Sequence, residues 1–167
     1  MIYKYNPNSE RYVFDSEISI ADIKMYFRQN NSGTFFNIFE TGLDSNRFDL
    51  IRLDPYREYV RIFEFKSCRA DFRADKKWEN YLKYCHTFTF VCPREVIQKD
   101  ELPPGIGLLW IYKWTHKMET PWSREMTWRL CGEWIKRPRK REIKEGVLRR
   151  LAFMLVYRTI WRKDDVF

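Results

Sequence analysis

The chain has 167 residues, of which 44% are hydrophobic and 18% aromatic, and its formal net charge is +8. This length and composition suit a single globular domain over residues 1–167, because a chain of this size can bury a core of its own. They exclude a membrane-spanning protein, since no uninterrupted apolar run approaches the length of a bilayer span, and the polar residues 1–10 do not resemble a secretory leader, so we expect a cytoplasmic protein.

The first three elements are predicted to be an edge segment, a helix and a strand. The residues up to Asp15 are expected to form an irregular or edge segment. Ser19 and Asp22 have the spacing of a capping box, and apolar residues then recur at helical intervals until residues 30–33 stop the helix. Residues 34–42 are predicted to form a strand that carries a glutamate near its end.

A predicted β-hairpin in the first half of the chain organises the rest. Two β-branched and aromatic runs flank the turn residues 54–55, which is the pattern of a hairpin. Because side chains alternate along a strand, facing Leu53 against Val60 fixes the register of the whole pair. The same register places Asp49 directly opposite Glu64.

The opposed carboxylates of Asp49 and Glu64 indicate a cation site. The other face of the second strand is also largely apolar, so we expect a central strand with its charged end buried. Two carboxylates across a ladder lie about 5 Å apart at Cβ and repel, so they must take up a proton or hold a cation. Mg²⁺ prefers one or two carboxylates with water and phosphate oxygens. Lys66 shares this face and can orient a water or neutralise charge on a phosphate.

The spacing of Asp49 and Glu64-Phe65-Lys66 resembles the Asp…(Asp/Glu)-X-Lys core of the PD-(D/E)XK nuclease superfamily. The continuation KSCRADFRADKKW, followed by Tyr81, is similar more narrowly to the MmcB-like DNA-repair branch. The core alone is a weak motif, whereas the longer run is fairly specific, and the resemblance extends over about residues 18–107.

This resemblance implies an α/β protein with the restriction-endonuclease-like (PD-(D/E)XK) fold, a mixed β-sheet flanked by helices. It also implies a deoxyribonuclease that depends on Mg²⁺ or Mn²⁺. Asp49, Glu64 and Lys66 are then the catalytic residues: the two carboxylates and the backbone carbonyl of Phe65 bind the metal, and Lys66 assists the attacking water. Glu40 is a further candidate ligand, because a Glu at the corresponding place lies beside the site in that family. A solvated strand-end charge is the alternative for Glu40.

The elements after the hairpin are predicted from their periodicity. Residues 72–84 are expected to form one helix whose charged residues, Asp75 among them, are mostly solvated. Residues 87–92 are expected to form a strand parallel to the second hairpin strand. Further strands are expected at residues 107–114 and 127–135, with His116 in a polar loop between them and without an assigned role.

The basic excess of the chain lies in its C-terminal segment. Residues 136–163 contain eleven Lys and Arg against two Glu, so this segment carries +9 and the remainder −1. Such asymmetry is expected of a polyanion-binding surface. An apolar stripe in the same segment predicts a helix docked on the core, which argues against a membrane-surface role. The residues assigned to nucleic-acid contacts are Ser67, Arg69, Arg137, Arg139, Lys140, Arg141, Arg149 and Arg150.

The sequence therefore favours a nuclease that cleaves DNA phosphodiester bonds, in DNA repair or in the processing of phage or mobile-element DNA. DNA is the expected partner, with RNA as an alternative substrate, and no membrane partner is expected. Two other classes stay open: a non-catalytic nucleic-acid-binding module of the same fold, and a basic interaction protein that binds an acidic partner. The three intact core residues favour the enzyme.

Overall fold

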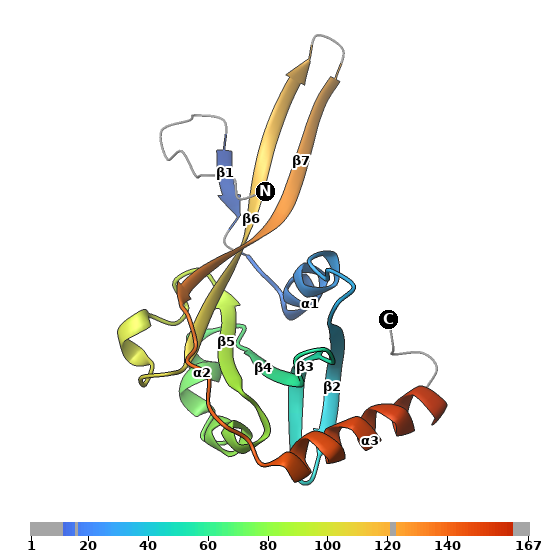
Figure 1. Cartoon of the computed structure of the whole chain (residues 1–167). Helices are drawn as coiled ribbons and strands as arrows, with labels where there is room; N and C mark the ends of the chain where they lie inside the picture. The colour runs from blue at the N-terminus through green and yellow to red at the C-terminus, as the bar shows by residue number, and fades with distance from the viewer. Residues whose placement is uncertain (1–11, 16, 121–122, 162–167) are drawn as a thin grey trace.

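The computed structural model describes residues 12–15, 17–120 and 123–161, and these form a seven-stranded mixed sheet with helices on both faces (Figure 1). The strand order is β1-β6-β5-β4-β3-β2. β5 and β1 pair with successive parts of one edge of β6, and β7 pairs with its other edge. The strands are β1 (Tyr12–Asp15), β2 (Phe36–Leu43), β3 (Asn46–Asp54), β4 (Tyr59–Phe65), β5 (Thr87–Pro93), β6 (Gly107–Thr120) and β7 (Ser123–Lys136). The helices are α1 (Ile20–Gln29), α2 (Arg69–Ala74), the 3₁₀ helices η1 (Trp78–Tyr84) and η2 (Lys99–Glu101), and α3 (Glu145–Trp161).

The predicted hairpin and its register are confirmed. β3 and β4 are antiparallel, and Leu53 pairs with Val60 as the alternation required. β5 runs parallel to β4, with Phe90 beside Glu64. β4 therefore lies between an antiparallel and a parallel neighbour, in the interior of the sheet.

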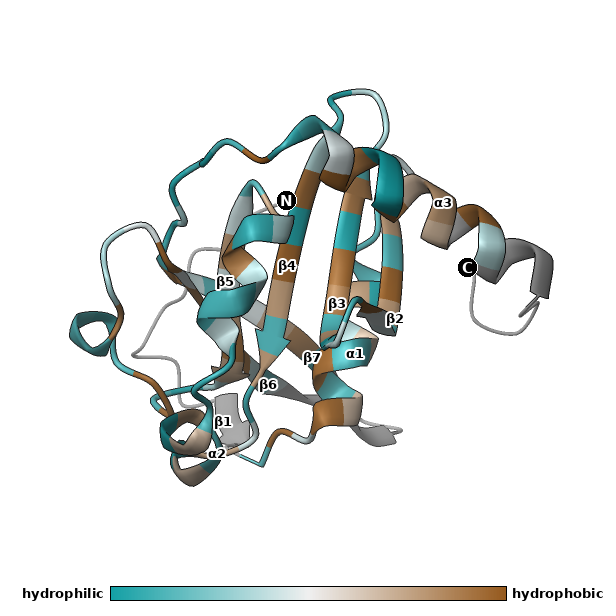
Figure 2. Cartoon of the chain, turned by 90° about the horizontal axis from the view of Figure 1, so that it is seen from below, coloured by the Kyte–Doolittle hydropathy of each residue, from teal (hydrophilic) through white to brown (hydrophobic). Residues whose placement is uncertain are grey.

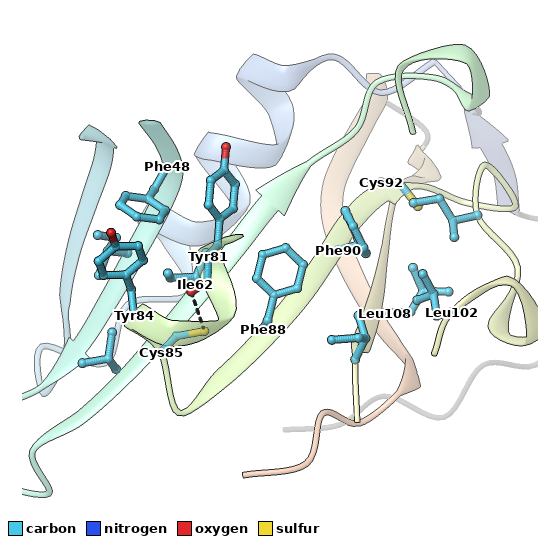
Figure 3. Packing of buried hydrophobic residues seen from close by; sticks show 14 of the residues in the cluster. Phe48, Ile62, Tyr81, Tyr84, Cys85, Phe88, Phe90, Cys92, Leu102 and Leu108 are labelled. Atoms are coloured by element: carbon cyan, nitrogen blue, oxygen red, sulfur yellow. Dashed lines mark hydrogen bonds between the residues drawn. The ribbon is translucent and has the colours of Figure 1, made fainter. Parts of the chain in front are cut away.

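Two apolar clusters sandwich the sheet, and they follow from the period-two pattern visible along β2 and β3 in Figure 2. On one face, Phe27 of α1 packs against Phe63 and Phe65, with ring centroids 4.8 and 5.7 Å apart. On the other face, η1 and the first half of α3 cover an aromatic cluster that includes Phe48 and Phe88 (Figure 3). Because both faces are covered, the charged end of β4 lies at a buried position.

Helix α1 begins as predicted. The Ser19 side chain accepts a hydrogen bond from the Asp22 backbone, and the Asp22 carboxylate accepts one from the Ser19 backbone. The pair satisfies two of the free N–H groups at the start of a helix. Residues 1–11, at the beginning of the expected edge segment, lie outside the described part of the chain, while β1 pairs with β6 over four residues.

The prediction of one continuous helix over residues 72–84 is wrong. α2 ends at Ala74, and η1 begins only at Trp78. Asp75 Oδ1 accepts hydrogen bonds from the backbone N–H groups of Lys77 and Trp78, at 2.8 and 3.2 Å. A side chain used in this way supplies an alternative to helical hydrogen bonding, which explains the break.

Strands β6 and β7 are longer than predicted. β5 pairs with β6 only as far as Ile111, whereas β6 and β7 stay paired with each other as far as Thr120 and Ser123. They form a hairpin that projects from the body of the sheet (Figure 1). His116, expected in a loop, lies within β6 opposite Thr127.

One side of α3 packs on the core. Leu151 is buried, and Val147, Leu148 and Met154 pack against the same cluster. The helix then extends past the edge strand β2 (Figures 1 and 2). The Phe153 side chain is 69% exposed. The predicted docking of the apolar stripe on the core is confirmed at Val147, Leu148, Leu151 and Met154 and is wrong at Ala152, which is exposed. No helix of the described residues is long and apolar enough to cross a membrane.

Candidate active site

Asp49 and Glu64 lie side by side where β3 and β4 separate. The regular pairing of the two strands ends at Leu50 and Phe63. One step further, Asp49 Oδ2 accepts a hydrogen bond of 2.8 Å from the backbone N–H of Phe65. A side-chain oxygen thus replaces the main-chain acceptor that a continuing ladder would supply, and the Asp49 carboxylate is fixed close to Glu64.

The pairing of β2 with β3 is irregular at the same place. Glu40 has φ +49°, a conformation that costs free energy for a residue with a side chain. Phe39 and Leu50 pack on the α1 side of the sheet, whereas Phe48 packs on the other side. The alternation of side chains therefore shifts by one at the step opposite Asp49.

The predicted third carboxylate, Glu40, is itself in ion pairs. Its side chain is half exposed and contacts Lys24 of α1 and, at 3.9 Å, Arg47. The hydrogen bond from Lys24 is the main cause of a pKa below the usual value for Glu40. The charge of Lys24 also opposes the rise in the pKa of Asp49, so Lys24 interacts with both Glu40 and Asp49.

The two central carboxylates share a strongly perturbed environment. Burial, and then the charge of Asp49, raise the pKa of Glu64 to about 8. Burial also raises the pKa of Asp49, although the hydrogen bond from Phe65 opposes this. Glu64 is 7% exposed, and its Oε2 atom is buried without a hydrogen-bond partner. A buried oxygen in this state favours either a proton or a cation.

Lys66 lies on the same side of β4 and is surrounded by acids. Its Nζ atom is 2.7 Å from Asp75, 3.2 Å from Glu64 and 3.8 Å from Asp71. Burial alone lowers the pKa of Lys66, but the hydrogen bond to Asp75 and the neighbouring negative charges outweigh it, and the pKa lies above the usual value. Lys66 is therefore a fixed positive charge.

Asp75 is the residue of the site that the sequence interpretation missed. It was assigned to a solvated helix face, but its side chain is only 11% exposed and pairs with Lys66. Burial raises the pKa of Asp75, while the hydrogen bonds from Lys66, Lys77 and Trp78 lower it more, so the group is ionised. The sequence did contain a signal for this role: an Asp side chain often caps the backbone N–H groups two and three residues after it, which here belong to Lys77 and Trp78.

Tyr81 of η1 completes the wall of the site. Burial, followed by the charges of Glu64 and Asp75, raises the pKa of Tyr81 to about 12. Its ring packs edge-on against Phe48, with centroids 4.9 Å apart (Figure 3). The neutral phenol thus separates the carboxylates from the aromatic cluster.

The basic linker, residues 137–144, joins β7 to α3 and runs along the opposite end of β4. The Arg141 N–H donates to the His86 carbonyl, and the His86 N–H donates to the Val60 carbonyl, both at 2.9 Å. The ring of Pro138 packs on Gly107, where an added Cβ would lie 2.9 Å from it. The linker is therefore placed at the start of β4 and β5, whereas Glu64 lies near the end of β4.

The residues assigned to nucleic-acid contacts divide into exposed and internally engaged groups. Arg69 donates to the Val96 carbonyl and the Glu101 carboxylate, and Arg150 pairs with Asp44. Arg141 is half-buried, and its Nη1 atom is buried without a hydrogen-bond partner. Arg150 is nevertheless exposed, as are Ser67, Arg137, Arg139, Lys140 and Arg149. Arg137 and Lys140 lie over the rings of Trp134 and Tyr59.

The comparisons with known proteins agree with this architecture. The SPO1766 protein of unknown function from Silicibacter pomeroyi superposes with a TM-score of 0.59 at 22% identity, over 82% of this chain and 80% of that one. This likeness and the mixed sheet flanked by helices confirm the predicted restriction-endonuclease-like fold. No curated protein matches the chain. The family model described as DNA repair protein MmcB-like matches residues 15–123, and the chain therefore belongs to the MmcB-like DNA repair protein family.

Proposed function

We propose that this protein is a nuclease that cleaves DNA phosphodiester bonds with Mg²⁺ or Mn²⁺, in DNA repair or in the processing of phage or mobile-element DNA. The observation that carries the proposal is the Glu64 carboxylate, which is buried beside Asp49 with one oxygen lacking a partner. Such a group costs free energy unless it is protonated or binds a cation. Membership of a DNA repair family supports a DNA substrate.

The donor set fits a hard divalent cation. Asp49 and Glu64 offer two carboxylates, and Mg²⁺ commonly binds one or two carboxylates together with water and phosphate oxygens. Among the described residues there is no group of three or more His, Cys, Asp or Glu side chains that forms a metal site by itself. The Phe65 carbonyl is a further ligand in our proposal. When bound, the cation stabilises negative charge on the phosphate and acidifies a water.

The protein's own residues position the reacting groups. The hydrogen bond from Phe65 fixes the Asp49 carboxylate, so this ligand is preorganised. Lys66 stays charged because its pKa is raised, which makes it a donor that orients water and stabilises developing negative charge rather than a proton acceptor. The hydrophobic wall around Tyr81 limits water at the site.

The exposed cations of the basic linker supply phosphate contacts in this proposal. Val60 and Glu64 are four residues apart on β4, which corresponds to about 13 Å along a strand. A nucleic acid lying along this direction reaches both the linker and the carboxylates over about four base pairs. Arg137, Arg139 and Lys140 are the cations best placed to bind it.

Cleavage assays test this proposal directly. Labelled linear, circular and branched DNA, each incubated with Mg²⁺, Mn²⁺ or EDTA, should be cut only when a metal is present. Cutting of the circle distinguishes an endonuclease from an exonuclease. The Asp49→Asn protein is the matched control, since it keeps the size of the side chain. Strong DNA binding without cleavage of any substrate would instead support the non-catalytic binding module.

A further inference from the structure

A carboxylate outside the predicted three-residue core is the nearest partner of Lys66. Asp75 Oδ2 lies 2.7 Å from Lys66 Nζ, compared with 3.2 Å for Glu64 Oε1. The two side chains are 5% and 11% exposed. At this burial such an ion pair is strong, because little water screens it.

The orientation of the Asp75 carboxylate is set by the fold. Its other oxygen accepts hydrogen bonds from the backbone N–H groups of Lys77 and Trp78. The Trp78 ring packs on Phe88 and Phe90, with centroids 5.6 and 5.5 Å apart. One oxygen is thus tied to the hydrophobic core through the start of η1, and the other is aimed at Lys66.

We propose that Asp75 is the positioning residue for Lys66, holding its ammonium group beside Glu64 while leaving the Glu64 carboxylate available to a divalent cation. The inference rests on the proposed nuclease function and adds a fourth residue to its machinery. Asp75 acts on the reaction only through Lys66.

The distances give the physical reason. Lys66 already donates a hydrogen bond of 3.2 Å to Glu64 Oε1. Without the charge of Asp75, the Lys66 ammonium would be drawn further to Glu64 and would compete with a cation for the same oxygens. With Asp75 present, Lys66 keeps a charged partner when a cation takes Glu64. Residues that orient a functional side chain in this way typically contribute 10- to 100-fold to metal affinity or activity, as an approximate range.

Asp75→Asn is the informative variant. An Asn side chain can still accept hydrogen bonds from Lys77 and Trp78, so the start of η1 is kept while the negative charge is lost. Asp71→Asn is the matched control, because Asp71 lies on the same segment and undergoes the same change of charge. Its carboxylate is 3.8 Å from Lys66 and more exposed.

Mn²⁺ binding to the full chain, measured by calorimetry, tests the proposal without cleavage. Asp75→Asn should raise the Kd for Mn²⁺ by about 10-fold or more, and Asp71→Asn by less than about threefold. In a Lys66→Met background, Asp75→Asn should have little effect, because there is no ammonium to compete. An equal loss in both backgrounds would overturn the proposal, since Asp75 would then act on the cation by its charge alone.

Two further measurements separate this inference from the nuclease proposal. In the metal-free protein, the NMR signal of the Lys66 ammonium should move in Asp75→Asn and stay near its wild-type position in Asp71→Asn. An unmoved signal in Asp75→Asn would overturn the inference even if the protein cleaves DNA. If the wild type cleaves, Asp75→Asn should lower kcat about 10-fold or more with little change in KM. Failure of the wild type to bind Mn²⁺ would overturn the nuclease proposal, and the ammonium signal would still decide the contact.

Discussion

The Asp49 carboxylate accepts a hydrogen bond of 2.8 Å from the backbone N–H of Phe65, the residue between Glu64 and Lys66. This bond links the two halves of the motif before any metal is involved. It also means that Asp49 has a structural and an electrostatic role, and that substitutions can separate them.

Asp49→Asn and Asp49→Ala are therefore expected to differ in the metal-free protein. The Asn oxygen can still accept from Phe65, and the repulsion with Glu64 is gone, so the melting temperature should be unchanged or higher. Ala leaves the Phe65 N–H without its acceptor, which costs about 1–3 kcal/mol. Both variants should lose Mn²⁺ affinity and cleavage. Strong destabilisation by Asn with unchanged metal affinity would make Asp49 a purely structural charge.

The contribution of Glu64 to the stability of the metal-free protein should fall as the pH rises from about 4.5 to about 8, because the pKa of Glu64 is raised from 4.5 to about 8. In this window the unfolded chain binds fewer protons than the folded one, so deprotonation favours unfolding. Glu64→Gln removes the titration. The melting temperature of Glu64→Gln minus that of the wild type should therefore grow across this window and level off above it. A difference independent of pH would contradict the raised pKa.

The hairpin and its carboxylates could be predicted because the period of two fixes the register. Once Leu53 faced Val60, alternation put Asp49 and Glu64 on one face, and the ladder confirms this register as far as Leu50 and Phe63. The parallel strand β5 was predictable for a similar reason, since a buried apolar strand after a connecting segment returns beside its predecessor. The resemblance to the nuclease superfamily added the roles, which no spacing provides.

The contact of Asp75 with Lys66 could not be predicted from the sequence, because apolar residues at helical spacing continue on both sides of Asp75 and favour a continuous helix. The break in the helix depends on hydrogen bonds from Lys77 and Trp78 and on a contact with Lys66, which comes from another element. The position of the basic linker was equally hidden. It depends on long-range contacts with Gly105 and His86, and local composition does not encode such contacts.

Replacing Arg137, Arg139 and Lys140 by Gln should weaken DNA binding equally on all sequences, because phosphate contacts position the nucleic acid without reading it. If each cation contacts one phosphate, the slope of log K against log salt should flatten by about 2.7. The control replaces Arg28, Lys99 and Arg129, which removes the same charge elsewhere. An unchanged slope in the linker variant would rule out the linker as the phosphate-binding surface.

Arg141 should behave differently from these three residues. Arg141 is half-buried and lies close to the Cys85 thiol. Burial of Cys85 raises the pKa of its thiol to about 12, and the positive charge of Arg141 acts in the opposite direction. We expect Arg141→Gln to lower the melting temperature as well as DNA affinity. Equal stability of Arg141→Gln and Lys140→Gln would show that Arg141 is not part of the packed interior.

The docking of α3 can be tested with two substitutions in one helix. Leu151→Ala should lower the free energy of unfolding by about 2–5 kcal/mol, because Leu151 is 1% exposed within the main cluster. Phe153→Ala should change it by less than about 0.5 kcal/mol, because that ring is 69% exposed. Denaturant unfolding measures both. Similar losses in the two variants would mean that the Phe153 side chain also packs on the core.

Lys66→Ala should abolish cleavage by a route different from that of Asp49→Asn. It leaves Asp49 and Glu64 in place and removes a neighbouring positive charge, so Mn²⁺ should bind as tightly as before or more tightly. The chemical step loses a preorganised donor, typically worth about 2.7–4 kcal/mol. Without metal, Asp75 and Glu64 are left without their buried cation, which should lower the melting temperature. Added Mn²⁺ should restore most of that loss, because binding to the folded state stabilises it. A Lys66→Ala protein that cleaves at the wild-type rate would show that the ammonium takes no part in the reaction.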